Sequence, residues 1–502
     1  MSTTLASGQG KPAAGEPAGH GGMWWRIAVP LAVVVALALT PPPAGLAQYA
    51  WYYFAIFGGV VAALVLEPLP NAAVGLIGIS VVAALAPWVL ESPADLAKPG
   101  FSLVSDAANW ALSGFASTTV WLVGGAFMFA MGYEKTGLGR RIALLLVRAR
   151  GRNTLMLGYA NAFAEGLLAI VTPSNTARGA GTVYPVLANL PAIYESYPND
   201  PSRRKIGSYV MYTAFAANTI TSSLFLTGCA PNFLALDFAR RIAKVNISWW
   251  DWFSAAAPFA LPLLLVMPIL VYFLYPPEIK RSAKASEWAG GQLSEMGGIT
   301  RKEIILGVLV TAAVLLWIFA DKWLDGSMVA FLAISLMLIF GVFTWNDMAR
   351  NHSAWTTVML LATLVTLAGG LARVGFIKWF AAIAAQHITG LDPMVTVMAL
   401  VSIYFFSHYM FASLTAHTSA MFPVMLAVGM GIPGMDPGKV ALALALTTGI
   451  MGILTPYATG AALPYYNSGF IRPAEFWRLG LIFGLISLGF LLLIAVPLLM
   501  SH

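Results

Sequence analysis

TPSNTAR, residues 172–178, interrupts an apolar stretch that runs from residue 153 to residue 190. A second apolar stretch, 393–431, is interrupted in the same way by SLTAHT at residues 413–418. Each stretch is long enough to cross a bilayer twice, but polar residues and proline break it near its middle. Irregular backbone facing lipid would leave peptide groups without hydrogen-bond partners, so such breaks must line a cavity walled by protein. We therefore predict two re-entrant helical hairpins, 153–190 and 393–431, whose tips stop inside the membrane.

The composition of the whole chain is that of an integral membrane protein. Of its 502 residues 59% are hydrophobic and 10% are charged, whereas a soluble domain has about 25% charged residues. Soluble enzymes, nucleic-acid-binding modules and secreted disulfide scaffolds are therefore excluded. The net charge of +7 indicates orientation in the bilayer rather than a nucleic-acid partner. The single cysteine, Cys229, permits no internal disulfide.

Hydropathy predicts an all-α polytopic fold with about eleven transmembrane helices in addition to the hairpins. The predicted spans lie near residues 24–40, 47–66, 72–90, 115–133, 206–225, 255–275, 303–320, 328–344, 354–372, 440–454 and 476–499. Residues 1–22 are rich in Gly, Ala, Ser and Pro and are predicted to form a disordered cytoplasmic tail. Residues 23–48 resemble a secretory signal peptide. We favour a retained first helix, with cleavage as the alternative.

The positions of Lys and Arg predict the orientation. They gather in residues 135–152, 203–205 and 280–302, which share one side of the membrane if the N-terminus is cytoplasmic. The C-terminus then lies outside the cytoplasm. The predicted location of the protein is a bacterial inner membrane. Residues 135–152 should form an amphipathic interfacial helix. The predicted organisation is a first half, a cytoplasmic connecting loop and a second half, at residues 23–275, 276–302 and 303–502.

The two halves resemble each other. GYEKTG at residues 132–137 matches GLARVG at 370–375, and each precedes an amphipathic segment. The hairpin tips follow, and then the motifs LTG at 226–228 and LTP at 454–456. If the first half spans an odd number of times, its copy is inverted, which is the plan of many secondary transporters. Interrupted segments at corresponding positions then indicate the binding site.

The hairpin tips and the breaks that follow them carry the candidate binding groups. A helix beginning near Thr176 has unpaired N–H groups and a positive dipole end, on which a carboxylate can dock. Backbone carbonyls at the tips and breaks could instead hold Na⁺. A packing role is the alternative for any single Ser or Thr. The candidate substrate-binding residues are Ser174, Asn175, Thr176, Arg178, Ser413, Leu414, Thr415, His417, Thr227, Gly228, Thr455, Pro456 and Thr459.

Arg178 and His417 occupy equivalent positions, four residues after the serine of each tip. A planar guanidinium matches a carboxylate in a bidentate manner, so one interpretation has both side chains converge on a divalent anion. The alternative is a structural ion pair between Arg178 and Glu165. His408 has no counterpart in the first half, and we interpret it as a polar packing residue.

These residues resemble the divalent anion:sodium symporter family, whose Ser-Asn-Thr signature matches residues 174–176. The longer tip sequences resemble the exchanger branch, which contains bacterial citrate/succinate and tartrate/succinate antiporters and plastid 2-oxoglutarate/malate translocators. The resemblance implies a homodimer with a scaffold and an elevator-type transport domain that holds a dicarboxylate between the two tips. Leu414 replaces the asparagine of the second signature, and TGCAPN at 227–232 departs from the family's Thr-Pro-Pro-Asn break, so a complete pair of Na⁺ sites is not expected.

The first functional hypothesis is exchange of C4–C6 di- or tricarboxylates, with fixed positive groups compensating the charge of the substrate. Na⁺-coupled dicarboxylate symport is the second, and Na⁺ would be a cofactor only in that case. A third hypothesis is a membrane-embedded hydrolase that uses Ser413 and His417. It is disfavoured because the other copy of the repeat has Arg178 where a base is needed, and the sequence contains no Gly-x-Ser-x-Gly or His-Glu-x-x-His motif. The expected partners are dicarboxylate anions, the bilayer and a second copy of the chain.

Overall fold

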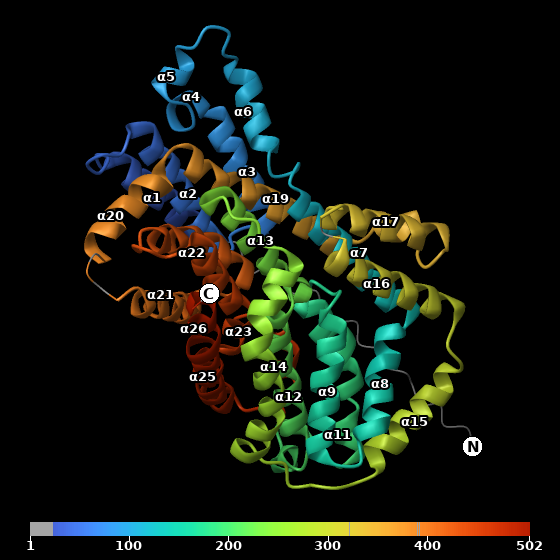
Figure 1. Ribbon diagram of the computed structural model, residues 1–502. Coiled ribbons are helices and arrows are strands. Elements are labelled where there is room, and N and C mark those ends of the chain that lie inside the picture. Colours follow the sequence, from blue (N-terminus) through green and yellow to red (C-terminus); the bar gives the residue numbers. More distant parts are fainter. Residues whose placement is uncertain (1–23, 321, 389, 391, 502) are drawn as a thin grey trace.

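The computed structural model describes residues 24–320, 322–388, 390 and 392–501 (Figure 1). Regular secondary structure in these residues is helical, apart from one isolated β-bridge between Asn153 and Arg281. The predicted all-α class is therefore confirmed, whereas the predicted disordered tail, 1–22, lies outside the described residues. Six described helices are long and apolar enough to cross a membrane, and the other apolar helices are shorter. The total of about eleven spans stays a prediction.

The first helices lie close to the predicted spans, except α5 and α6, which lie between two of them. They are α1 (Trp24–Leu39), α2 (Gln48–Leu66), α3 (Asn71–Ala84), α4 (Ala86–Val89), α5 (Pro93–Leu96), α6 (Leu103–Leu112) and α7 (Thr118–Thr136). Helix α6 was not predicted, because its ten residues are fewer than a span needs. In Figure 1 the segment from α4 to α6 projects from one end of the molecule. Helices α2, α3 and α7 pack with three later helices, α16 (Arg301–Phe319), α17 (Gly326–Ile339) and α19 (His352–Arg373).

The first hairpin has one regular arm and one irregular arm. Its rising arm is α9 (Thr154–Ala169), and the returning arm consists of η2 (Ala177–Val183), α10 (Tyr184–Leu187) and α11 (Leu190–Ile193). The element η2 is a π-helix rather than the α-helix expected there. A Cβ on Gly179 would lie 2.8 Å from the side-chain nitrogen of Asn218, so this wide turn brings the backbone against α12 (Gly207–Leu224). Such π-turns occur frequently at functional sites.

A broken helix follows each hairpin. In the first half α12 ends, η4 (Leu226–Gly228) makes the break, and α13 (Ala230–Phe238) continues into η5 (Ala239–Ala243) and then α14 (Trp249–Leu274). The side-chain amide of Asn232 donates to the carbonyls of Ser222 and Phe225 at 2.7 and 3.1 Å. These bonds satisfy carbonyls that the interrupted helix leaves unpaired, so the break is a built feature of the fold.

The connecting segment is not only a loop. Residues 276–302 contain α15 (Lys284–Met296), which packs on α8 (Leu138–Arg150), the predicted amphipathic helix. Because α8 is covered by α9 on one side and α15 on another, one of its arginines is buried: Arg141 pairs with Glu303 at 2.6 Å. A short helix, α18 (Trp345–Ala349), precedes α19.

The second half repeats the order of the first. Its elements are α20 (Phe376–Ile388), the hairpin α21 (Pro393–Ser407), η6 (His408–Met410) and α22 (Leu414–Met430), the broken segment α23 (Pro437–Ile450), η7 (Met451–Ile453) and α24 (Ala462–Asn467), and finally α25 (Pro473–Phe490), η8 (Leu491–Ala495) and α26 (Val496–Ser501). An arm helix precedes each hairpin, and a broken helix follows it. Helix α12 packs on α9 and α23, whereas α22 packs on α13 and α23. The broken helices therefore lie at the centre of both hairpins.

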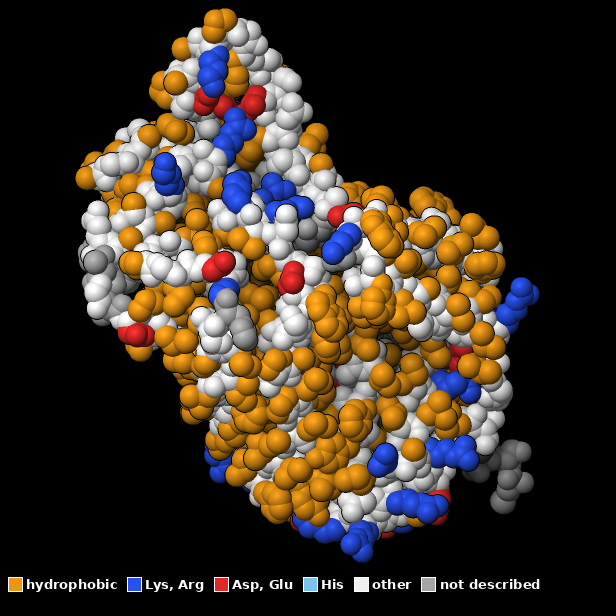
Figure 2. Space-filling view, in the orientation of Figure 1, with side chains coloured by type: hydrophobic (Ala, Val, Ile, Leu, Met, Phe, Trp, Pro, Cys, Tyr) orange, Lys and Arg blue, Asp and Glu red, His pale blue; other side chains and the backbone are white. Residues whose placement is uncertain are grey.

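Basic segments that are distant in sequence meet at one end of the molecule. Backbone hydrogen bonds join Thr154 to Lys280, Ser282 to Arg152 and Glu278 to Arg204, at 3.0–3.2 Å. Figure 2 shows Lys and Arg side chains along this end, below α11 and α15. Three segments that the sequence assigned to one side of the membrane thus lie together.

Candidate functional site

The two hairpin tips meet at a cavity of about 390 Å³. Seven predicted site residues lie in its wall: Ser174, Asn175, Thr176, Ser413, Leu414, Thr415 and Thr459. The other lining residues are Phe127, Pro173, Ala177, Ala230, Pro231, Ser353, Thr357, Leu360, Ala412 and Gly460. None of these lining residues carries a carboxylate, so the cavity presents hydroxyl, amide and apolar groups to a solute.

Each tip presents the start of a helix capped by serine. The hydroxyl of Ser174 accepts from the Ala177 N–H at 3.1 Å, and the hydroxyl of Ser413 accepts from the Ala416 N–H at 3.4 Å. A hydroxyl that accepts from the backbone still has its own proton to donate. Two helix N-termini with such donors make an electropositive cavity suited to carboxylate oxygens.

The two tips differ at the residue after the serine. The side-chain amide of Asn175 donates to the hydroxyl of Thr459 at 2.9 Å, and so joins the first tip to the loop that follows the second break. Leu414, at the equivalent place, forms an apolar part of the wall and packs near Gly452. The cavity is therefore more polar on the side of the first tip.

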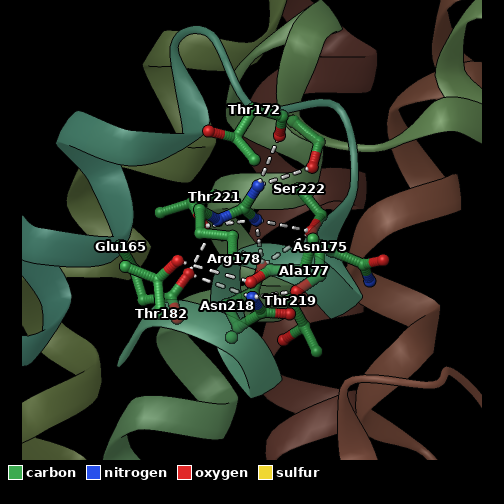
Figure 3. Close-up of polar contacts among 12 residues, drawn as sticks. Glu165, Thr172, Asn175, Ala177, Arg178, Thr182, Asn218, Thr219, Thr221 and Ser222 are labelled. Atoms are coloured by element: carbon green, nitrogen blue, oxygen red, sulfur yellow. Dashed lines mark hydrogen bonds and ion pairs between the residues drawn. The ribbon is translucent and has the colours of Figure 1, made fainter. Parts of the chain in front are cut away.

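Arg178 does not line the tip cavity, although it lies in the wall of a larger neighbouring cavity. Groups of the first tip and of α12 surround its side chain (Figure 3). Its side chain has no exposed surface, and its Nε donates to Glu165 at 2.7 Å. Its two Nη atoms donate to five more oxygens, and these bonds measure 2.8–3.4 Å. The acceptors are the carbonyls of Thr172, Gly228 and Asn218 and the hydroxyls of Thr221 and Ser222. This arrangement supports the alternative interpretation, in which Arg178 pairs with Glu165, over a direct grip on substrate.

His417 is also buried outside the cavity wall. Its Nε2 lies 2.8 Å from the hydroxyl of Ser407 on the other arm of the hairpin, and its ring stacks on Tyr404. His408 lies beside it, with ring centroids 5.0 Å apart, and its Nε2 lies 3.0 Å from the Ala458 carbonyl. Neither Arg178 nor His417 lines the tip cavity, and a contact between either side chain and a solute stays a prediction. In the second half His417 contacts the other arm of the hairpin, and His408 contacts the loop after the break. Arg178 alone makes both kinds of contact in the first half.

Residues of the first break form hydrogen bonds with residues next to the first tip. The hydroxyl of Thr227 donates to the Ile170 carbonyl at 2.6 Å, and the Gly228 carbonyl accepts from Arg178. Thr455 and Pro456 are buried, and the Thr455 hydroxyl has no hydrogen-bond partner among the described residues. These four predicted residues, unlike Thr459, do not line the tip cavity.

A larger vestibule of about 520 Å³ adjoins the tip cavity. The two share Phe127, Ala177 and Ser353 in their walls, so the tip cavity and the vestibule lie next to each other. Lys135 and Asp347 also line the vestibule, where they form an ion pair at 2.7 Å. The bond from Lys135, together with those from Thr344, lowers the pKa of Asp347 to about 2, so its carboxylate stays ionised at neutral pH.

The fold is shared with solved transporter structures. The YdaH transporter of Alcanivorax borkumensis matches with a TM-score of 0.50 and 17% identity, covering 85% of this chain and 96% of that one. MtrF of Neisseria gonorrhoeae matches with a TM-score of 0.52 and 14% identity, covering 85% and 93%. A family model, that of the sodium:sulfate symporter transmembrane region, matches residues 22–500. The chain belongs to this family.

Curated members of the sodium:sulfate symporter family are similar over nearly the whole chain. The citrate/succinate antiporter of Escherichia coli K12 is 47% identical, over 95% of this chain and 98% of its own length. The L-tartrate/succinate antiporter of the same strain is 46% identical, over 93% and 96%. The resemblance inferred from the tip sequences is thereby confirmed, and the protein is a member of a transporter family rather than an enzyme.

In this member of the sodium:sulfate symporter family, sequence reasoning missed the wall opposite the tips. Ser353, Thr357 and Leu360 come from α19 and face the hairpins, with Phe127 from α7 beside them. The spacing of four and three residues, two of them hydroxyl-bearing, puts the three on one stripe of the helix. That stripe was the available signal, but the sequence does not show which stripe of a largely apolar helix faces the tips.

Proposed function

We propose that this chain exchanges C4–C6 di- or tricarboxylates, of the succinate, malate, 2-oxoglutarate, tartrate or citrate type, across the bacterial inner membrane. The tip cavity supports this proposal, because two capped helix starts and their hydroxyls offer donors at opposite sides of a space of about 390 Å³. Two antiporters that are 46–47% identical to this chain are named for citrate, tartrate and succinate, which supports the same substrate class.

Exchange rather than Na⁺ symport is favoured by the position of Arg178. Carbonyl and hydroxyl oxygens at such breaks are the groups that hold Na⁺ in transporters. Here the Arg178 guanidinium lies between the first tip and the first break, where it donates to the carbonyls of Thr172 and Gly228 and to three oxygens of α12. A permanent cation therefore fills the place that a Na⁺ would need. The positive helix ends then face an empty cavity until an anion enters, which favours movement of the loaded protein.

Na⁺-coupled symport is the second candidate, and the second break carries the observation in its favour. The hydroxyl of Thr455 is buried without a partner, and in the part of the chain that the structure describes no arginine donates a hydrogen bond to this break. A Na⁺ at this position would find oxygen ligands that the first break does not offer.

Proteoliposomes distinguish the two candidates. We expect uptake of labelled succinate or citrate to require an unlabelled dicarboxylate inside the vesicle and to be unchanged when choline replaces Na⁺. Strong Na⁺-driven uptake into vesicles without internal substrate would contradict exchange and support symport.

We further propose an elevator-type homodimer in which the helices around α2, α3, α7, α16, α17 and α19 form the scaffold and the two hairpins move with α12, α13 and α23. Each hairpin would be re-entrant, and the N-terminus would lie in the cytoplasm. The basic end formed by the 148–152, 203–205 and 280–284 segments supports this orientation.

Single cysteines test the orientation. Cys229→Ala removes the only thiol, and cysteines are then placed near Ser202 and Lys439. The chain runs from Ser202 through α12 and α13 to Val245, which packs beside Gly438. We expect impermeant thiol reagents to label the two cysteines from opposite sides of the membrane. Labelling of both from the same side would refute the inverted repeat.

A further inference from the structure

A third cavity, of about 610 Å³, is lined by four cationic side chains and no carboxylate. Arg241 and Lys244 come from the end of the first broken helix, and Arg373 and Lys378 come from α19 and α20. It shares no lining residue with the tip cavity. In Figure 2 several Lys and Arg side chains gather below the projecting α4–α6 segment, in the region of α13 and α19.

The two arginines are held in place by carboxylates outside the cavity wall. Arg241 donates from Nε to Asp237 at 2.6 Å, and Arg373 donates from Nη2 to Glu91 and Asp106 at 2.5–2.9 Å. The Nη atoms of Arg241 donate no hydrogen bond to any described residue, and they lie beside Gly369, which has no side chain to cover them. The Nη atoms of Arg241 are therefore fixed in position, and their N–H groups are available to bind a ligand.

The two lysines supply charge that the protein does not neutralise. Neither Lys244 nor Lys378 makes a salt bridge or a side-chain hydrogen bond within the described part of the chain. Lys244 has a φ of 59° at the end of the π-helix η5, a backbone conformation that a residue with a side chain adopts at a cost. With Arg240, which shares Asp237, the region has five cations against the three carboxylates of Asp237, Glu91 and Asp106.

The internal repeat relates this cavity to the vestibule of the tip cavity. Arg373 holds in GLARVG the place that Lys135 holds in GYEKTG, and each residue lines a cavity at the end of its helix. The vestibule beside Lys135 adjoins the tip cavity. The cavity beside Arg373 is more basic, because Glu134 and Asp347 line the vestibule whereas no carboxylate lines the cavity beside Arg373.

We propose that the cavity formed by Arg241, Lys244, Arg373 and Lys378 is a binding site for a multivalent oxyanion, separate from the site between the hairpin tips. A cleft in a protein that is lined by one sign of charge concentrates ions of the opposite sign. Its volume and its dispersed donors suit a di- or tricarboxylate from solution or the phosphate of an anionic lipid. The hydroxyl of Ser113, also in the wall, adds a neutral donor.

A thiol placed in the cavity tests this site without any transport measurement. In a Cys229→Ala background, Ser113→Cys is reacted with a sulfonate-bearing and with a trimethylammonium-bearing methanethiosulfonate. We expect the anionic reagent to react about ten-fold faster or more at low salt, and the preference to fall as salt rises. Ala108→Cys, exposed in the middle of the same helix and outside the cavity wall, is the matched control and should show little preference.

The lysine variants and competing anions complete the test. Lys244→Gln with Lys378→Gln should abolish the preference at Ser113→Cys, and both side chains are exposed, so the fold should tolerate the change. Citrate or inorganic phosphate should slow the anionic reagent in zwitterionic nanodiscs if the ligand is a soluble anion. Slowing only when phosphatidylglycerol is present would identify a lipid headgroup. Equal rates for both reagents, a preference that survives the lysine changes, or no protection by any of these anions would overturn the proposal.

Discussion

Arg178→Gln should lower the free energy of unfolding by about 3–5 kcal/mol, the range measured when one partner of a buried ion pair is removed. The Glu165 carboxylate has no exposed surface, and Arg178 is its ion-pair partner. The neutral glutamine would also leave several of the five other oxygens around the guanidinium without donors. Thermal or denaturant unfolding of the purified protein in detergent measures the loss.

The double change Arg178→Gln with Glu165→Gln separates the two interpretations of the arginine. We expect it to regain most of the lost stability and part of the exchange activity, because both members of the buried pair are then neutral and the cavity wall is unchanged. A double variant that folds as well as the unchanged protein but fails to bind a dicarboxylate would show that Arg178 grips substrate. Arg178→Lys should be less stable and less active than the unchanged protein, because an ammonium group cannot donate to all six acceptors.

Arg141 and Glu303 provide a matched control for this prediction. They form a second ion pair at 2.6 Å, with side chains 10% and 1% exposed, and neither lines the tip cavity. Removing Arg141 alone should also destabilise the protein. The pair of changes Arg141→Gln and Glu303→Gln should leave the apparent affinity for substrate unaltered, which isolates effects that reach the tips from general effects on the fold.

Much of the helical architecture could be predicted from the sequence because it follows from local properties. The apolar length of a span and the polar interruption at Ser174 or Ser413 are visible in a few consecutive residues, and the helices begin and end close to the predicted positions. The repeat was visible for the same reason. Helix α6 was missed because ten residues carry too little of this signal.

The candidate site was predicted only as far as backbone position determines it. The serines and their neighbours line the cavity because they are at the tips, and their place at the tips follows from the local sequence alone. The direction of the Arg178 side chain depends on Asn218, Thr221 and Ser222 of α12, far along the sequence, and on the π-turn of η2. A pattern search gives the residue and its charge, but it does not give the acceptors that tertiary packing places around it.

Gly449→Ala is expected to destabilise the protein strongly, although it adds only one methyl group. A Cβ on Gly449 would meet the backbone nitrogen of Ser223 and the carbonyl carbon of Ser222, at separations that real Cβ atoms do not show. These atoms belong to α12, where it crosses α23, and the Ile450 N–H donates to the Ser223 hydroxyl at 2.9 Å. Backbone atoms cannot move aside as a flexible side chain can.

The magnitudes decide the sign of this change. Alanine is favoured over glycine inside a helix by about 1 kcal/mol, whereas forcing extra volume into a packed core costs about 1–3 kcal/mol and sometimes more. The contact here is with backbone at the crossing of the two broken helices, so we expect a net loss of about 2 kcal/mol or more, measured by unfolding in detergent.

Gly452→Ala, three residues further along the chain, is the control for Gly449→Ala. The atoms nearest to its added Cβ would be side-chain methyl carbons of Thr459, Thr219 and Leu414, at 3.4–3.7 Å, which is ordinary van der Waals contact. That variant should stay within about 0.5 kcal/mol of the original protein. If Gly449→Ala proved equally harmless, α12 and α23 could separate without cost. The hairpins, which pack on these two helices, would then lack the rigid centre that keeps both tips at one cavity.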